Sequence, residues 1–386
     1  MLLRYLKKIF YNSVAELRFI VQGEGRGHLT QAISMEKLLR SNGHEVVEVL
    51  VGKSESRRLP GFFIRNIQAP VKQFISPNFL PTHANKRVNL TRSILYNLLK
   101  VPEYAESICY INRHIKETGA ELVINFYELL TGLTYFFFRP AVPQICIGHQ
   151  YLFLHNQFKL PKKNKCSLFF LNFFTRLTAL GASQKLALSF RSMPEDNHQH
   201  ISVVPPLLRQ DVLQQESKPG DYIHGYMLNA GFSENILNWH KKHPDTPLRF
   251  FWDHWEEEPV KKIDSTLSFY QLDDIEFLRQ MAGCKAYAST AGFESVCEAM
   301  YLGKPILMVP AHIEQECNAF DAMQNGAGII DHNFNLSNLL RFSQNYKPNR
   351  LFVEWVKSAE YIILNEIERF APQNTLQGMY LVEEFV

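Results

Sequence analysis

The chain has 386 residues, of which 46% are hydrophobic and 20% are charged, and its formal net charge is +3. This length exceeds one ordinary domain and fits two α/β halves, each with a sizeable core. The near balance of charge, without interleaved basic and aromatic residues, argues against nucleic acid as a partner.

The amino-terminal segment Met1–Phe10 mixes leucine, isoleucine and phenylalanine with Arg4, Lys7 and Lys8, as a basic amphipathic membrane anchor does. It has no continuous apolar stretch and no small-residue cleavage site, so a signal peptide is not expected. No run of 18 apolar residues is present, and no transmembrane helix is predicted.

A βαβ unit is predicted next. An apolar strand over 18–21 leads to the turn Gly-Glu-Gly-Arg-Gly-His at 23–28, then to a helix from Ala32 to Arg40 and a strand over 44–51. A dinucleotide site needs Gly-x-Gly-x-x-Gly and an acidic residue ending the second strand, and the chain has neither. This disfavours an NAD-dependent oxidoreductase. The glycines either only permit a tight crossover or bring His28 to a substrate.

Two further strands of this half end in polar residues. Strand Glu121–Ile124 is followed by Asn125 and Glu128, and strand 144–148 is followed by a polar cluster. Ligands of open α/β sheets bind at the carboxyl ends of the strands. The cluster therefore supplies candidates for acceptor contacts, with ordinary surface side chains as the alternative: His149, Gln150, Tyr151 and His155.

The segment Leu168–Leu180 is unusually rich in phenylalanine and follows the basic run 162–165. A core helix beside a solvated loop is the simpler interpretation. Docking to an anionic bilayer is the alternative, because it uses the same pairing of cations and bulky apolar residues.

Pro205 and Pro206 mark a linker, after which a second α/β series is predicted. Its elements are a strand over 222–228, a turn over 229–231, a helix over 234–240, strands over 248–252 and 267–269, and a helix over 274–281. The expected fold class is α/β, with two doubly wound Rossmann-like domains facing each other across a cleft.

The most informative segment begins at Ala286. A short buried strand to Ser289 is followed by a turn containing Gly292, a helix from Phe293 to Leu302 and a strand over 306–309. The helix start attracts an anion, and Ser295 adds a hydroxyl donor. Glu298, one turn further, is suited to binding two ribose hydroxyls. A diphosphate with its ribose is the expected ligand.

Pro310 then opens a predicted loop with three side chains able to bind sugar hydroxyls: Glu314, Gln315 and Asn318.

These residues resemble the donor-binding signature of UDP-glycosyltransferases of the GT-B fold. Gly292, Ser295 and Glu298 match its glycine, its phosphate-binding serine and its ribose glutamate, while Thr290 stands where the family has histidine and leaves a hydroxyl donor. The remaining matches are Glu314-Gln315 for the Asp-Gln pair and Asn318-Ala319 for the Asn-Ala pair.

The amino-terminal Gly-His turn resembles the acceptor-side loop of the same families, including the peptidoglycan N-acetylglucosaminyl transferase. The resemblance implies acceptor contacts at Gly25 and Gly27 and a general base at His28, in place of a structural or substrate-orienting role. Asn125 occupies the slot of the acidic residue that orients this base. Either Glu128 substitutes for it, or the base works without a charged partner.

The resemblance also assigns lesser roles. The loop near Phe269 holds the base of the nucleotide through backbone groups, and Asn229 and Gly231 face the diphosphate. The implied division of the chain is an acceptor-binding domain over 1–204, a nucleotide-sugar domain over 205–349, and a carboxy-terminal helical segment over 350–386 that packs back on the first domain.

The expected protein is an inverting, metal-independent glycosyltransferase that moves a hexose from a UDP-sugar to a hydroxyl of a glycan, lipid or small molecule. No Asp-x-Asp triplet and no metal-ligand spacing occur, so neither a metal nor a cofactor is expected. The cysteines form no Cys-x-x-Cys pair, which fits a cytoplasmic protein, with peripheral contact at the inner face of a membrane as a further expectation. The alternatives are a sugar-nucleotide epimerase or hydrolase and a non-catalytic nucleotide-sugar binding protein.

Overall fold

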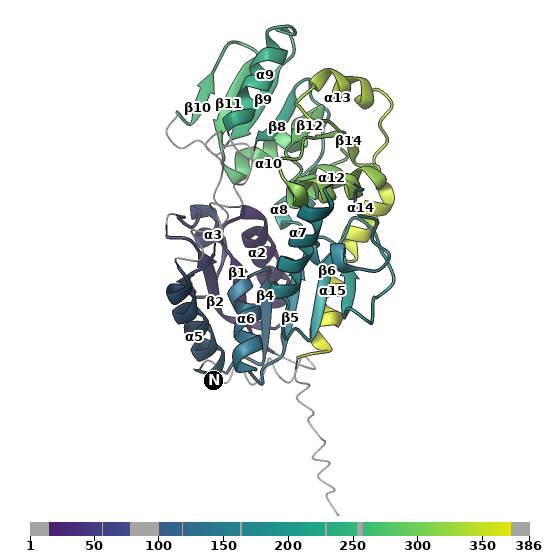
Figure 1. Ribbon diagram of the computed structural model, residues 1–386. Coiled ribbons are helices and arrows are strands. Elements are labelled where there is room, and N and C mark those ends of the chain that lie inside the picture. The colour runs from purple at the N-terminus through teal and green to yellow at the C-terminus, as the bar shows by residue number, and fades with distance from the viewer. Residues whose placement is uncertain are drawn as a thin grey trace, which may run out of the picture.

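The computed structural model describes residues 15–55, 57–77, 100–117, 119–162, 164–227, 230–252 and 258–371. The expected anchor at Met1–Phe10 and the expected diphosphate contact at Asn229 lie outside these ranges. The described chain forms two seven-stranded sheets, one in each half of the molecule (Figure 1).

The first sheet has the order β3-β2-β1-β4-β5-β6-β7, and all its strands are parallel. Strand order reverses between β1 and β4, which is where open α/β sheets bind ligands. The strands are β1 (Glu16–Gln22), β2 (Glu45–Lys53), β3 (Val71–Ile75), β4 (Leu122–Phe126), β5 (Gln144–Gly148), β6 (Gln184–Leu188) and β7 (Ile201–Val204).

Alternate residues of β1 pack on opposite faces of this sheet. Phe19 lies in a cluster with Leu29 of α2, whereas Ile20 lies in a cluster with Ile111 of α5 and Leu130 of α6. The helices of the amino-terminal half are α2 (Arg26–Ser41), α3 (Gly61–Asn66), α5 (Val101–Glu117), α6 (Leu129–Phe138), the 3-10 helix η1 (His149–Leu154), α7 (Lys165–Thr178) and the short α8 (Gln210–Leu213).

The second sheet repeats the design, with the order β10-β11-β9-β8-β12-β13-β14 and a reversal between β8 and β12. Only its edge strand β10 runs antiparallel among the described strands. The strands are β8 (Ile223–Met227), β9 (Leu248–Trp252), β10 (Val260–Lys262), β11 (Leu267–Gln271), β12 (Ala286–Ser289), β13 (Ile306–Met308) and β14 (Gly328–Ile330).

Helices cover both faces of the second sheet as well. Buried side chains of α9 and α13 share a cluster with Phe250 on one face. Buried side chains of α10, α11 and α12 share the larger cluster that contains Phe251 on the other face. The elements are η2 (Ala230–Phe232), α9 (Ser233–His240), α10 (Asp274–Gly283), α11 (Phe293–Tyr301), α12 (Ile313–Gln324) and α13 (Leu336–Ser343).

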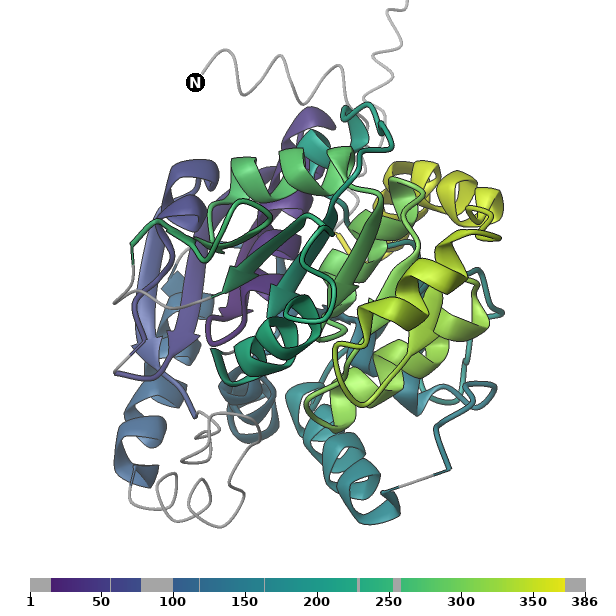
Figure 2. The ribbon, with the colours of Figure 1, turned by 90° about the horizontal axis from the view of Figure 1, so that it is seen from above.

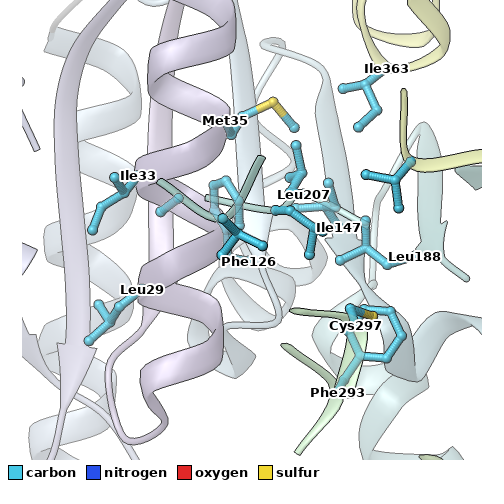
Figure 3. Close-up of a cluster of buried hydrophobic side chains, with 14 of the residues drawn as sticks. Leu29, Ile33, Met35, Phe126, Ile147, Leu188, Leu207, Phe293, Cys297 and Ile363 are labelled. Carbon is cyan, nitrogen blue, oxygen red and sulfur yellow. The ribbon is translucent and has the colours of Figure 1, made fainter. Parts of the chain in front are cut away.

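The two halves share one hydrophobic cluster. Phe293 and Cys297 of α11 belong to the same cluster as Ile147 and Leu188 of the first sheet, and Figure 3 shows the four side chains in one region. Figure 2, seen from above, has the green second sheet over the purple and blue first half. Burial of these apolar side chains therefore stabilises the contact between the two halves.

The chain crosses back to the first half at its end. In α14 (Arg350–Lys357), the Trp355 indole donates a 3.0 Å hydrogen bond to the Ser189 carbonyl. In α15 (Ala359–Glu368), Glu366 accepts a 2.9 Å bond from the Ser202 hydroxyl of β7. Figure 1 shows this yellow segment running down beside the first sheet.

Three sequence-based boundaries are wrong in ways that affect the site. Helix α2 begins at Arg26 and not at Ala32, so His28 lies in its first turn. Asn125 lies inside β4 and not after it, because the buried strand tolerates an amide that is fully hydrogen-bonded. The loop expected after Pro310 is largely helix, since α12 starts at Ile313.

Candidate active site

Two helix N-termini, one from each domain, meet between the sheets. Helix α2 has Gly25 as its N-cap, and α11 has Gly292. A Cβ atom placed on Gly27 would lie 3.4 Å from the Cγ of Glu294 in α11. Helix α2 follows β1 and α11 follows β12, and each of these strands lies where the strand order of its sheet reverses. Both N-termini attract anions.

Strained backbone occurs after the strands on either side of this meeting point. Tyr127, directly after β4, has φ of 60°, and Ala291, between β12 and α11, has φ of 62°. Left-handed conformations are costly for residues other than glycine and concentrate at functional sites. The two outliers therefore mark the same region as the helix N-termini.

His28 is held by neighbours on three sides. Its Nδ1 lies 3.3 Å from Oε1 of Gln31, its Nε2 lies 3.5 Å from the amide nitrogen of Gln150, and its ring stacks on Tyr127 at 5.5 Å. Burial lowers the pKa of His28, against the opposing effect of the Glu314 carboxylate. The ring is therefore neutral near pH 7, with the Nδ1 proton directed to Gln31 and Nε2 free to accept.

Asn125 and Glu128 do not contact His28 in the structure. The Asn125 amide donates to the carbonyls of Glu128 and Thr178, at 3.2 and 2.9 Å. Glu128 caps α6 by accepting a 2.9 Å bond from the Thr131 amide and also accepts from Ser76. The expectation that one of them orients His28 fails, because both are committed to the start of α6.

Gln31 is the residue that fills this role, and the sequence analysis missed it. It lies three residues after His28, on the same face of α2, and its amide donates a 2.5 Å bond to Glu294 of α11. Burial raises the pKa of Glu294 to about 8. The signals available in the sequence were the i,i+3 spacing of His28 and Gln31 and an acidic residue in the first turn of the donor helix.

The start of α11 carries three of the predicted donor residues. Ser295 donates a 3.2 Å bond to the Gly292 carbonyl and lies 3.5 Å from the Ser289 hydroxyl. The hydroxyl oxygen of Thr290 is buried and has no hydrogen-bond partner. Buried hydroxyls are ordinarily paired, so this one is a candidate for contact with a ligand.

Glu298 is buried and paired with Arg209, which the sequence analysis also missed. The arginine Nε and Nη2 both contact Oε1, at 2.7 and 2.6 Å. Arg209 also lies 3.8 Å from Asp274, at the start of α10. The carboxylate is therefore not the free ribose ligand expected from the sequence, although only one of its oxygens takes part in these bonds.

The three polar residues expected in a loop stand on α12 and differ in what they contact. Glu314 accepts a 3.0 Å bond from the Gln150 amide and so faces His28. Gln315 accepts from the Ala311 backbone amide at 2.9 Å, and Asn318 donates to the Ala291 carbonyl at 3.3 Å. Gln315 and Asn318 thus brace the turns around the site.

Most of the remaining candidates point into the protein. His149 bonds the Leu188 carbonyl at 2.6 Å and stacks on Phe293 at 4.0 Å, while His155 bonds the Pro194 carbonyl at 2.9 Å. Tyr151 is buried and pairs with Thr178. The expectation that Tyr151 and His155 contact an acceptor is wrong, because their polar atoms bond within the fold. His149 keeps its buried Nε2 without a hydrogen-bond partner, and Gln150 reaches His28.

The loop near Phe269 was expected to hold the nucleotide base through backbone groups, and Gly231 was expected to face the diphosphate. The Phe269 ring is buried and stacked on Trp252 at 4.6 Å, so its side chain does not reach the site, and Gly231 lies in η2. Within the described residues, no group of three or more histidine, cysteine or acidic side chains is placed to hold a metal ion.

The family model described as glycosyl transferase family 1 matches residues 15–346. The chain belongs to this family. It is therefore a glycosyltransferase, as the sequence predicted. No curated protein matches the chain.

Solved structures of similar fold are GT-B glycosyltransferases. The "glycotransferase of kitacinnamycin" is 12% identical, with a TM-score of 0.64, over 94% of this chain and 100% of that one. UGT2 of Phytolacca americana, complexed with UDP-2-fluoro-glucose and pterostilbene, is 12% identical (TM-score 0.62; 93% and 100% covered). UGT89C1 of Arabidopsis thaliana, complexed with UDP-L-rhamnose, is 13% identical (TM-score 0.59; 93% and 100% covered).

At these identities the neighbours establish the fold of the glycosyltransferase, and the predicted pair of Rossmann-like domains is confirmed. In the part of the chain that the structure describes, no helix is both long enough and apolar enough to cross a membrane.

Proposed function

We propose that this glycosyltransferase moves a hexose from a UDP-sugar to an acceptor hydroxyl, with inversion at the anomeric carbon and without a metal ion or cofactor. The observation that carries the proposal is the meeting of α2 and α11, because it brings a neutral histidine and an anion-binding helix N-terminus to one place. Among the described residues we assign one base and no covalent nucleophile, an assignment that favours direct, inverting displacement.

His28 acts as the general base in this mechanism. Its Nδ1–H is bonded to Gln31, which leaves Nε2, 3.5 Å from the Gln150 amide nitrogen, to accept the proton of the acceptor hydroxyl. The hydroxyl oxygen forms its bond to the anomeric carbon as the bond from that carbon to the diphosphate breaks. A neutral imidazole suits this step near pH 7.

The start of α11 receives the diphosphate. The free backbone N–H groups after Gly292 and the Ser295 and Thr290 hydroxyls are donors for its oxygens as negative charge grows on them. Glu294, with its pKa raised to about 8, is protonated near neutral pH and adds no negative charge at this point. In this proposal the Glu298 oxygen that Arg209 does not contact accepts from a ribose hydroxyl.

The proposed donor carries a uracil nucleotide, and the proposed compartment is the cytoplasm. Among the fold neighbours, some carry UDP or UDP-sugars, which supports a uracil nucleotide for this chain. Reaction in the cytoplasm, with an acceptor that is a glycan, lipid or small molecule, is part of the same proposal.

Thermal stabilisation by UDP, UDP-sugars, TDP-sugars, GDP-sugars and NAD tests the donor class. We expect UDP compounds to give the largest shift. UDP release is then measured with and without a panel of hydroxyl acceptors and with a chelator. Release that depends on acceptor and ignores the chelator is expected. Release without acceptor would indicate a hydrolase or epimerase, and intact donor with every acceptor would indicate a binding protein.

A further inference from the structure

Helix α7 carries an aromatic face that points away from the protein. Phe169, Phe170 and Phe173 are 66%, 49% and 52% exposed, and the Phe169 ring contacts both others, with centroids 5.7 and 6.4 Å apart. The helix buries Leu168 and Thr175 instead. The core-helix interpretation of this segment is therefore wrong for these three rings.

The end of the neighbouring helix α6 carries a second group of exposed phenylalanines. Phe136 and Phe137, at the end of α6, are 56% and 64% exposed, and their rings are in edge-to-face contact. Helices α6 and α7 pack against each other on the same side of the first sheet (Figure 1). With Phe138, which is 43% exposed, the two adjacent helices expose six phenylalanines, more than the scattered apolar side chains of an ordinary soluble surface.

The sequence of these helices is basic, and a carboxylate of the second half, Glu316 of α12, accepts a 2.9 Å hydrogen bond from Asn164 at the start of α7. Between Leu129 and Pro194 the sequence contains eight lysine or arginine residues and no aspartate or glutamate. The cations next to the aromatic helices are exposed: Arg139, Lys162, Lys165 and Arg176. Such a surface requires a partner that is apolar where the rings enter and anionic where the cations lie.

A second copy of this chain does not meet that requirement. A two-fold interface brings the same patch of both copies together, and here it would face cations with cations and offer no carboxylate from this stretch. A bilayer with anionic headgroups provides both features, because phenylalanine rings enter the interface while cations meet the headgroups.

We propose that α7 and the end of α6 form a docking surface for an anionic lipid bilayer. The surface is independent of the sugar-transfer reaction, and its partner is the lipid headgroup layer. The rings supply apolar contact, and the four cations supply an attraction that salt weakens.

Sedimentation of the full chain with vesicles tests this surface. Vesicles of phosphatidylcholine alone are compared with vesicles of equal parts phosphatidylcholine and phosphatidylglycerol. We expect binding to the anionic vesicles, at least about tenfold weaker binding to the neutral ones, and loss of binding at high salt. Equal binding to both vesicle types, or none to either, would overturn the proposal.

Variants assign the binding to α7. The triple variant Phe169→Ser, Phe170→Ser, Phe173→Ser and the double variant Lys162→Glu, Lys165→Glu should each lose at least about tenfold in affinity for anionic vesicles. The matched control is Ile275→Ser with Leu351→Ser, which removes apolar side chains that are 81% and 83% exposed on other helices. Circular dichroism and the thermal shift with UDP verify folding.

Two results with these variants would contradict the assignment. Undiminished vesicle binding by the triple variant would show that another surface docks. A wild-type dimer that the triple variant abolishes, without vesicle binding by the wild type, would assign the aromatic face to self-association.

Discussion

Gln31 in the amino-terminal domain donates a hydrogen bond of 2.5 Å to Glu294 in the carboxy-terminal domain, and the same side chain holds Nδ1 of His28. One amide thus joins the proposed general base to the first turn of the proposed donor helix. The alignment of the base depends on how the two domains meet, which makes this contact sensitive to substitution on either side.

The pH dependence of donor binding tests the protonation of Glu294. Its pKa is raised to about 8, so the group is neutral below that value and becomes a carboxylate above it. A carboxylate at the start of α11 repels a diphosphate, and we expect the affinity for UDP to fall as the pH rises from 7 to 9. Isothermal titration calorimetry across this range measures the effect.

The matched variant for this test is Glu294→Gln, which keeps the size and the bond to Gln31 but cannot ionise. Its affinity for UDP should stay level over the same pH range. A wild-type affinity that does not change between pH 7 and 9, or the same fall in both proteins, would contradict the assignment.

Removing the imidazole separates catalysis from donor binding. The variant His28→Ala should keep the thermal shift with UDP and lose about 10²–10⁴-fold in turnover, as expected for a missing general base. Because burial lowers the pKa of His28, the wild-type rate should decline only below pH 6.5, the ordinary pKa of the group. Full activity of the His28 variant would show that the base is another residue.

The ion pair of Arg209 and Glu298 should matter for both stability and donor binding. Arg209→Met leaves the buried carboxylate without its partner, and the cost in free energy of unfolding should be about 3–5 kcal/mol. Glu298→Ala should abolish the thermal shift with UDP. Chemical denaturation measures the first effect, with Arg209→Lys as a milder control. A stable Arg209→Met variant with normal UDP binding would indicate that the pair has neither role.

The close packing of α6 against α7 gives a prediction about stability that does not depend on the proposed reaction. A Cβ on Gly132 would lie 2.1 Å from the Leu177 carbonyl oxygen, so Gly132→Ala must push the two helices apart. A loss of about 1–3 kcal/mol in stability is expected. Ser167→Ala is the control, because this side chain is exposed on α7 and the change introduces no new atom into the packing. Equal unfolding midpoints for the two variants would contradict the packing.

The sequence predicts the architecture well because local patterns encode it. Apolar strands such as β1 and β12, each followed by a glycine turn and an amphipathic helix, define βαβ units without reference to the rest of the chain. The start of α11 was identified for the same reason. The bounds of α2, β4 and α12 were misplaced, and for the two helices the reason is that polar residues in a first turn resemble a loop.

Contacts between distant residues were beyond such patterns. Gln31 and Glu294 are 263 positions apart, and Arg209 and Glu298 are 89 apart. Nothing local distinguishes a glutamate paired with a distant arginine from one that waits for a ribose. The phenylalanines of α7 pose a similar problem, because a segment apolar on every side does not reveal which rings remain exposed.

The most direct test of the central claim is the affinity for UDP of Gly292→Asp compared with Gly292→Asn. Both side chains fit, because a Cβ at this position would have only the Ser295 hydroxyl nearby, at 3.7 Å, and both cap a helix well. Only aspartate adds a negative charge where the diphosphate is proposed to bind. We expect the asparagine variant to bind UDP nearly as the wild type does and the aspartate variant to bind it about 100-fold more weakly. Equal affinities of the two variants would contradict the claim that the diphosphate lies at the start of α11.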